Sequence, residues 1–256
     1  MAESPALLEA RSVTVHFGGI RALHEASLAV GRGEAVGLVG PNGAGKTTLF
    51  DVISGRRHPD GGSVWFDGRR IDGLAPHRRA RLGIARTFQR LEVFPELTVL
   101  EHLLVAERAR RGNGALWKDL LNMSAPSADE RRRVAEVVEL VGLGDVLDTP
   151  VAALGLGLCR LVELGRALAT GPRLLLADEP SSGLDAHETT QLAEVLRSVQ
   201  HQRSMAVLLV EHDLRMVART VDRVVVLDVG RVIAEGSFDE TIAQPAVQRA
   251  YLGRGA

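Results

Sequence analysis

The chain has 256 residues, of which 45% are hydrophobic and 25% charged, as in ordinary soluble globular proteins. Its formal net charge is −1 and only 4% of its residues are aromatic, so neither a polyanionic partner nor a base-stacking platform for nucleic acid is indicated. A single cysteine, Cys159, excludes an internal disulfide. Because the sequence shows neither a secretory signal nor an apolar run of the roughly 18 residues that a membrane span needs, we expect a cytoplasmic protein that reaches a membrane only through partners.

Short strand-like runs separated by turns dominate the first part of the chain. We expect strands over residues 12–17, 26–30, 34–39 and 63–66. The last of these lies between two turns rich in aspartate and glycine, as in a β-hairpin. Phe17 ends the first strand just before a pair of glycines. Its ring could stack on an adenine, although lone aromatic residues on strands more often belong to the core.

The loop after the third of these strands matches the phosphate-binding pattern G-x-x-x-x-G-K-[ST] without mismatch. It comprises Gly40, Pro41, Asn42, Gly43, Ala44, Gly45, Lys46 and Thr47. Glycines let backbone N–H groups point at phosphates, the lysine brings positive charge to the β/γ-phosphates, and the threonine hydroxyl can ligate Mg²⁺. A helix is expected over residues 46–53, and we include Thr48, in its first turn, among the nucleotide-binding residues. The alternative is a chance glycine-rich turn, which the flanking strand and helix argue against.

Helical periodicity replaces the strand pattern in the middle of the chain. Between residues 98 and 141 apolar residues recur at spacings of three and four, and Ser127 with Glu130 resembles a capping box. We therefore expect a helical lobe near residues 90–160, inserted into an α/β core. Gln89 lies at the border of this lobe. Its amide could contact both Mg²⁺ and the attacking water and report the nucleotide state to the lobe, or it could be an ordinary surface residue.

The last third of the chain alternates helices with near-continuous apolar runs. These runs, at residues 173–177, 206–210 and 223–227, are typical of strands in a parallel sheet covered on both faces. Asp178 and Glu179 end the first run. A strand-end cap would explain such a pair by itself. Beside a phosphate loop, however, Asp178 is a candidate to hold Mg²⁺ through water, and Glu179 is a candidate to polarise the attacking water.

His212 follows the second of these apolar runs, where the active sites of parallel sheets collect. The imidazole could hydrogen-bond the γ-phosphate and orient the attacking water. The alternative is that it caps the helix that follows.

In this order these elements resemble the ATP-binding subunit of ABC transporters over essentially the whole chain. The matching positions are Phe17 for the adenine-stacking aromatic, 40–47 for the Walker A loop, Gln89 for the Q-loop, 174–179 for Walker B and its glutamate, 182–185 for the D-loop, and His212 for the switch histidine. The resemblance implies a P-loop NTPase (RecA-like) core with an antiparallel β subdomain, approximately residues 1–89 and 161–256, and an inserted α-helical subdomain, residues 90–160. It also implies ATP and Mg²⁺ as cofactors. The metal would be held by Thr47, Gln89 and Asp178, and the catalytic residues would be Glu179, His212 and Gln89.

Finer motifs resemble the subfamily that takes up branched-chain amino acids. They are residues 83–89, 94–100, 210–213 and 250–253, together with the long helical insertion. Relatives that handle amides, urea or lipopolysaccharide share much of this pattern. The resemblance implies a chain at the cytoplasmic face of the cell membrane that pairs with a second ATP-binding subunit, identical or paralogous. The pair would drive two transmembrane permease subunits, served by an external solute-binding protein.

The family's signature motif, usually LSGGQ, corresponds to residues 154–158, which read Leu-Gly-Leu-Gly-Leu. In the family this motif and the D-loop, here with Asp185, face the partner's nucleotide. Gly155 replaces the serine whose hydroxyl reaches the γ-phosphate, Leu158 replaces the glutamine, and Gly157 is kept. Losing a hydrogen bond to a charged group costs about 1.5–3 kcal/mol if nothing replaces it. We therefore expect an ATPase motor with altered closure on its partner, and the alternative is a regulatory nucleotide-binding module with little turnover.

Overall fold

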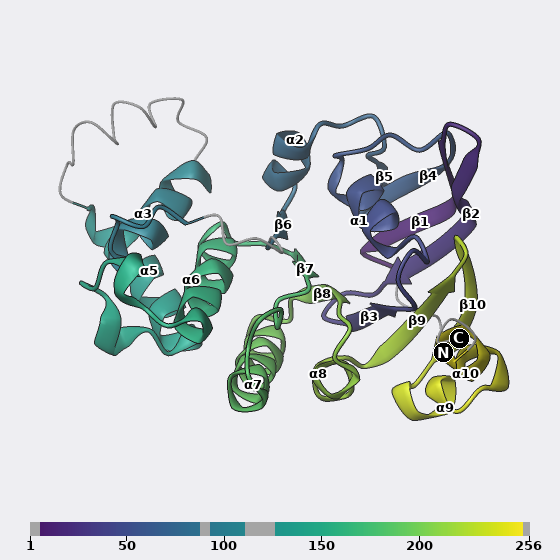
Figure 1. Cartoon of the computed structure of the whole chain (residues 1–256). Helices are drawn as coiled ribbons and strands as arrows, with labels where there is room; N and C mark the ends of the chain where they lie inside the picture. Colours follow the sequence, from purple (N-terminus) through teal and green to yellow (C-terminus); the bar gives the residue numbers. More distant parts are fainter. Residues whose placement is uncertain (1–5, 88–92, 111–125, 253–256) are drawn as a thin grey trace.

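Two β-sheets form the frame on which the helices pack (Figure 1). The computed structural model describes residues 6–87, 93–110 and 126–252. Within these ranges the larger sheet has six strands in the order β10-β9-β3-β8-β7-β6, and the smaller has four in the order β2-β1-β4-β5. The strands are β1 (Leu8–Phe17), β2 (Ile20–Val30), β3 (Ala35–Val39), β4 (Gly61–Phe66), β5 (Arg69–Arg70), β6 (Ile84–Arg86), β7 (Leu174–Asp178), β8 (Ala206–Val210), β9 (Arg223–Asp228) and β10 (Arg231–Gly236).

Parallel pairing joins β6, β7, β8, β3 and β9 of the larger sheet, and β10 runs antiparallel to β9 at one edge. Every residue of β3, β7 and β8 is buried. Side chains alternate between the two faces of the sheet. On β8, Leu208 and Val210 belong to a core shared with the smaller sheet and α1 (Lys46–Ser54), whereas Val207 and Leu209 belong to a second core with α6 (Leu156–Ala169) and α7 (Ala186–Arg203). The expected parallel sheet covered on both faces is confirmed.

The smaller sheet is antiparallel, and its strands are longer than the sequence pattern predicts. β1 begins at Leu8 and β2 at Ile20, and the two pair along most of their length across a turn at Gly18-Gly19. Both strands alternate buried with exposed residues and their pairing shifts register, so no continuous apolar run marks their full extent. The predicted hairpin is confirmed: β4 pairs with β5 across Asp67-Gly68, whose positive φ angles of 52° and 72° suit a tight hairpin turn.

A group of helices lies to one side of the two sheets (Figure 1). It contains α3 (Val99–Arg110), α5 (Ala128–Val141) and α6, whose apolar side chains form one core with a face of the larger sheet. The predicted capping box opens α5, because Ser127 Oγ accepts from the Glu130 N–H and the Glu130 carboxylate accepts from the Ser127 N–H. The small residue Gly165 of α6 allows a close approach to α3, since an added Cβ would lie 3.0 Å from Leu103 Cδ2.

The other elements complete the chain. They are α2 (Pro76–Arg81), the short 3₁₀ turns η1 (Gly144–Val146) and η2 (Val151–Ala153), α8 (Leu214–Thr220), α9 (Phe238–Ile242) and α10 (Pro245–Leu252). Among the residues that the structure describes, no helix combines the length and the apolar character that a membrane crossing requires.

Candidate active site

The carboxyl ends of three neighbouring parallel strands bring most of the predicted site residues to one edge of the larger sheet. The phosphate loop follows β3, Asp178 ends β7 and is followed by Glu179, and His212 comes two residues after β8. β8 lies between β3 and β7 in the sheet. Ligand sites of parallel α/β sheets form at this edge, so strand order alone places loop, carboxylates and histidine together.

Backbone geometry explains the glycines of the phosphate loop. Gly40, Gly43 and Gly45 have φ angles of 148°, 77° and 107°, a region that other residues rarely adopt. A Cβ on Gly40 would overlap the carbonyl oxygen of Leu227, and one on Gly45 would lie 2.7 Å from the carbonyl oxygen of Ala22. Gly45 also stands at the N-cap of α1, where it offers no side-chain acceptor to the first N–H groups of the helix. The loop therefore presents an uncapped helix N-terminus, which suits an anion.

Lys46 is folded over this loop. Its ammonium donates to the carbonyl oxygens of Gly40 at 2.6 Å and Pro41 at 3.0 Å, and the side chain is buried. Burial lowers the pKa of Lys46, and the negative charge of Glu179 opposes that shift. A buried ammonium held by neutral carbonyls favours an anionic ligand, because phosphate oxygens would supply the compensating charge.

Asp178 has a protein cation as its partner in this structure. Its Oδ2 accepts from Arg86 Nη2 at 2.7 Å, and its backbone N–H donates to Thr87 Oγ1 at 3.3 Å. Burial raises the pKa of Asp178, and the hydrogen bond from Arg86 acts in the opposite direction. The sequence predicts Mg²⁺ as the partner of this buried carboxylate, and it does not predict the contact with Arg86 at the end of β6.

The residues present fit Mg²⁺ in the nature of their donors. Thr47 contributes a hydroxyl in the first turn of α1 and Asp178 a carboxylate at the end of β7, and Mg²⁺ takes oxygen ligands of both kinds. Within the described residues no group of three or more His, Cys, Asp or Glu side chains could hold a metal by itself. Phosphate oxygens and water would complete such a site, as is usual where Mg²⁺ binds together with a nucleotide. Gln89, the third predicted metal ligand, lies outside the described residues.

Glu179 and His212 meet directly. His212 Nε2 and Glu179 Oε1 are 2.8 Å apart, a distance at which the ring N–H donates to the carboxylate. Glu179 has a φ of 46°, which costs a non-glycine residue on the order of 1 kcal/mol or more, and its N–H donates to the carbonyl of Val210. The cap of α8 is the Asp213 side chain, which accepts from the Arg215 N–H. The imidazole thus lies against the predicted catalytic carboxylate, and the helix cap considered as an alternative for it is supplied by Asp213.

Glu211 supports this pair, and sequence reasoning missed it. The side chain is buried; Oε1 accepts from the N–H of Ser181, and Oε2 accepts from the N–H groups of His212 and Asp213. One carboxylate therefore ties the segment after β7 to the turn that carries His212. The available signal was an acid at the end of a fully apolar strand, a position that is costly unless the charge has partners.

The signature segment begins α6, with Gly155 at the N-cap. The Gly157 N–H donates to Glu188 Oε1 at 3.3 Å, and Glu188 Oε2 accepts from the Asp185 N–H at 3.1 Å. Asp185 itself caps α7 by accepting from the N–H groups of His187 and Glu188. An added Cβ on Gly157 would lie 2.7 Å from Glu188 Oε1, so the glycine lets this carboxylate approach the helix N-terminus. Glu188 thus connects the signature segment with the D-loop turn.

Phe17 is not a core residue. Its side chain is half exposed at the end of β1, and the Arg57 guanidinium lies 3.8 Å from the ring centroid. Arg57 also donates to the carbonyl oxygen of His16. The ring therefore carries a cation on one face and is open to solvent elsewhere, which leaves it accessible to a planar ligand.

Known proteins resemble this chain in sequence and in fold. Residues 23–182 match the family model described as ABC transporter. The chain is 36% identical over 250 residues to the high-affinity branched-chain amino acid transport ATP-binding protein BraF of Pseudomonas aeruginosa. The matched region covers 96% of this chain and 98% of BraF. The ADP conformation of MJ1267, an ATP-binding cassette of an ABC transporter, matches with a TM-score of 0.86 at 30% identity over 98% of this chain and 100% of that chain. The dimeric post-hydrolysis structure of the cassette MJ0796 with ADP and Pi matches with a TM-score of 0.73 at 25% identity, over 90% of this chain and 98% of that one. The chain therefore belongs to the ABC transporter family, as one of its nucleotide-binding ATPase cassettes.

Proposed function

We propose that this cassette hydrolyses Mg·ATP to power an importer of branched-chain amino acids or related small solutes. The observation that carries the hydrolytic part is the contact between Glu179 and His212 beside the phosphate loop. The substrate class is inferred from BraF, a branched-chain amino acid transport protein that this chain resembles over nearly its whole length. Amides, urea and lipopolysaccharide remain alternative substrates of related systems.

Each side chain has a defined role in this proposal. Lys46 and the N–H groups of residues 40–48, other than Pro41, bind the phosphates, and Phe17 stacks on the adenine. Thr47, Asp178 and Gln89 hold Mg²⁺, which when bound neutralises charge that develops on the phosphates. The Glu179 carboxylate accepts a hydrogen bond from the attacking water and draws its proton toward Oε1 or Oε2, while the His212 ring fixes that carboxylate and faces the γ-phosphate.

Glu179→Gln tests the hydrolytic role. The amide keeps the shape of the side chain but cannot accept a proton, so phosphate release should fall by about 100-fold or more while ATP binding is retained. Glu194→Gln, which changes an exposed glutamate of α7, is the matched control and should hydrolyse ATP as the parent chain does. Full hydrolysis in Glu179→Gln would remove Glu179 from the mechanism.

The proposal also needs partners. We infer a pair of cassettes, identical or paralogous, in which approximately residues 1–89 and 161–256 form the catalytic core with its β subdomain and approximately residues 90–160 form the helical subdomain. Gly155, Gly157 and Asp185 then face the nucleotide of the other subunit. MJ0796, a cassette solved as a dimer with ADP and Pi, supports this arrangement. Two permease subunits would hold the pair at the cytoplasmic face of the membrane and receive solute from an external binding protein.

Purification of the tagged chain from its native cells in mild detergent tests the assembly. Two hydrophobic permeases and either one or two kinds of cassette should co-purify in fixed ratio. Recovery of the chain without any membrane protein would contradict the importer assignment. It would favour the second candidate, a regulatory nucleotide-binding module, which the glycine and leucine at signature positions 155 and 158 make worth testing.

A further inference from the structure

Arg86, the last residue of β6, links the two halves of the proposed metal site. Its Nη2 donates to Asp178 Oδ2 at 2.7 Å, and its Nη1 donates to Asp51 Oδ1 at 2.7 Å and to Ser54 Oγ at 2.9 Å. Asp51 and Ser54 belong to α1, the helix that starts with Lys46 and Thr47. One guanidinium therefore joins the helix of the phosphate loop to the carboxylate at the end of β7.

Burial makes this bridge strong on the Asp178 side and weaker on the other. The side chains of Arg86 and Asp178 are each 10% exposed, whereas that of Asp51 is 31% exposed. The guanidinium carbon also lies 4.9 Å from the centroid of the Phe50 ring. Since charge-assisted hydrogen bonds gain strength where water is excluded, the arginine competes effectively for Asp178 in this state.

A divalent cation at Asp178 would meet this arginine. Mg²⁺ bound to the carboxylate, directly or through one of its waters, would stand within a few ångströms of the guanidinium, and two positive charges that close repel each other in a site with little water. The guanidinium also has acceptors other than Asp178, because its Nη1 donates to Asp51 and Ser54. It can release Asp178 and keep these two contacts.

We propose that Arg86 is a positioning residue that neutralises Asp178 in the metal-free chain and releases it to the divalent cation, with Asp51 retaining the arginine afterwards. This inference rests on the proposed role of Asp178 in metal binding. It gives the ligand-free cassette an internal cation beside its buried carboxylate, at the expense of a weaker apparent affinity for metal.

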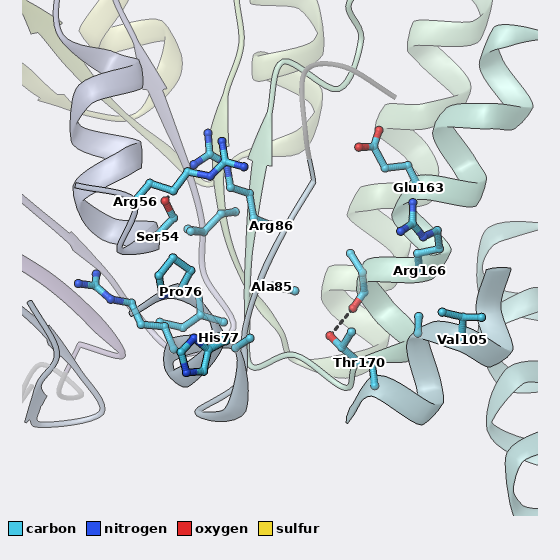
Figure 2. A pocket seen from close by; sticks show the side chains of 17 residues that line it. Ser54, Arg56, Pro76, His77, Ala85, Arg86, Val105, Glu163, Arg166 and Thr170 are labelled. Atoms are coloured by element: carbon cyan, nitrogen blue, oxygen red, sulfur yellow. Dashed lines mark hydrogen bonds between the residues drawn. The ribbon is translucent and has the colours of Figure 1, made fainter. Parts of the chain in front are cut away.

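The arginine also connects the site to its surroundings. Together with Ser54 and Arg56, Arg86 lines one wall of a groove whose opposite wall carries Val105 of α3 and Glu163, Arg166 and Thr170 of the α6 segment (Figure 2). A movement of the guanidinium away from Asp178 therefore takes place at the border between the sheet core and the helical lobe. Metal loading would thereby move a side chain at that border.

Manganese binding to the full chain tests the proposal without any turnover. Mn²⁺ accepts the same oxygen ligands as Mg²⁺, and its free ion is counted by electron paramagnetic resonance while Mn²⁺ is titrated in the presence of adenylyl imidodiphosphate. Arg86→Met should lower the Mn²⁺ concentration for half-saturation by about tenfold, because the competing charge-assisted hydrogen bond is gone. Asp51→Asn should raise it, by roughly threefold, because the guanidinium that leaves Asp178 then has no carboxylate with which it can strengthen its contact.

Arg86→Met and Asp51→Asn are expected to shift the Mn²⁺ concentration for half-saturation in opposite directions, which a merely structural role would not produce. In the double variant Arg86→Met/Asp51→Asn, the effect of the asparagine should vanish, since the two residues act through one contact. Arg56→Met, an arginine of the same groove, is the matched control and should leave the half-saturation unchanged. Analogue affinity in EDTA should be the same in all variants.

The possible failures are distinguishable. If Asp178→Ala leaves Mn²⁺ binding unchanged, the proposed metal role of Asp178 is wrong and the inference falls with it. If Asp178→Ala weakens Mn²⁺ binding but Arg86→Met fails to strengthen it, only the inference about Arg86 is overturned. If Arg86→Met does not fold, Asp51→Asn still tests the proposal. An unchanged or lower Mn²⁺ concentration for half-saturation in Asp51→Asn would contradict the role of Asp51 in holding the displaced arginine.

Discussion

Replacing Glu211 by glutamine tests whether one buried carboxylate holds the segments after β7 and β8 together. Its two oxygens accept from the N–H groups of Ser181 at 2.8 Å, His212 at 2.9 Å and Asp213 at 3.3 Å. An amide has only one acceptor oxygen. In its better orientation that oxygen keeps the bonds from His212 and Asp213, and the NH₂ group then faces the Ser181 N–H, donor against donor.

The cost follows from this count. One charge-assisted hydrogen bond is lost, at about 1.5–3 kcal/mol, and a buried N–H is left without an acceptor, so we expect a destabilisation of about 3 kcal/mol. For a chain of this size that corresponds to a fall in Tm of roughly 6–12 °C. Phosphate release should also fall, because the turn that carries His212 is no longer tied to the segment after β7.

Urea and thermal unfolding, followed by circular dichroism, measure this effect. The matched control is Glu139→Gln, an exposed glutamate of α5, which should change stability by less than about 0.5 kcal/mol. If Glu211→Gln is as stable as that control, the carboxylate does not hold the segments after β7 and β8 together. The account of how the histidine is held would then be wrong.

Three further predictions concern other positions. Lys46→Ala should weaken nucleotide binding by about tenfold or more, because the ammonium proposed to bind the phosphates is removed, and an unchanged affinity in equilibrium titration would contradict the role of the loop. Gly155→Ser should be neutral or raise ATP hydrolysis, since a Cβ there meets nothing within 4 Å and a serine suits a helix N-cap, whereas a large drop would show that the chain is adapted to glycine. Burial lowers the pKa of His102, so near pH 6.5 this side chain binds fewer protons in the folded chain than in the unfolded chain. Its contribution to the free energy of unfolding is therefore present above about pH 6.5 and is lost as the pH falls below that value. His102→Gln should therefore flatten the fall in unfolding free energy below about pH 6.5, by up to 1.4 kcal/mol per pH unit, and an unaltered slope would show that His102 is not responsible.

Local patterns predicted the parts of this protein that depend on neighbouring residues. The phosphate loop can be predicted from the sequence because its glycines are required by the backbone conformation of the loop. Gly40, Gly43 and Gly45 have positive φ angles, as this explanation requires. The capping box at Ser127 and the tight turn at Asp67-Gly68 were likewise predicted and are present. The bounds of β1 and β2 were less predictable, because strands that alternate buried and exposed residues give a weaker signal than fully buried ones.

By itself the sequence determined the fold class, the phosphate loop and the order of the carboxylates and histidine along the chain. Only the tertiary structure decided which charges meet. Arg86 and Asp178 are 92 residues apart and pair because β6 lies beside β7 in the sheet, and Gly157 reaches Glu188 because α6 begins next to the turn that opens α7. Motifs arise from short-range backbone preferences, whereas partners of buried charges depend on strand order and helix packing, which bring together segments that share no local pattern.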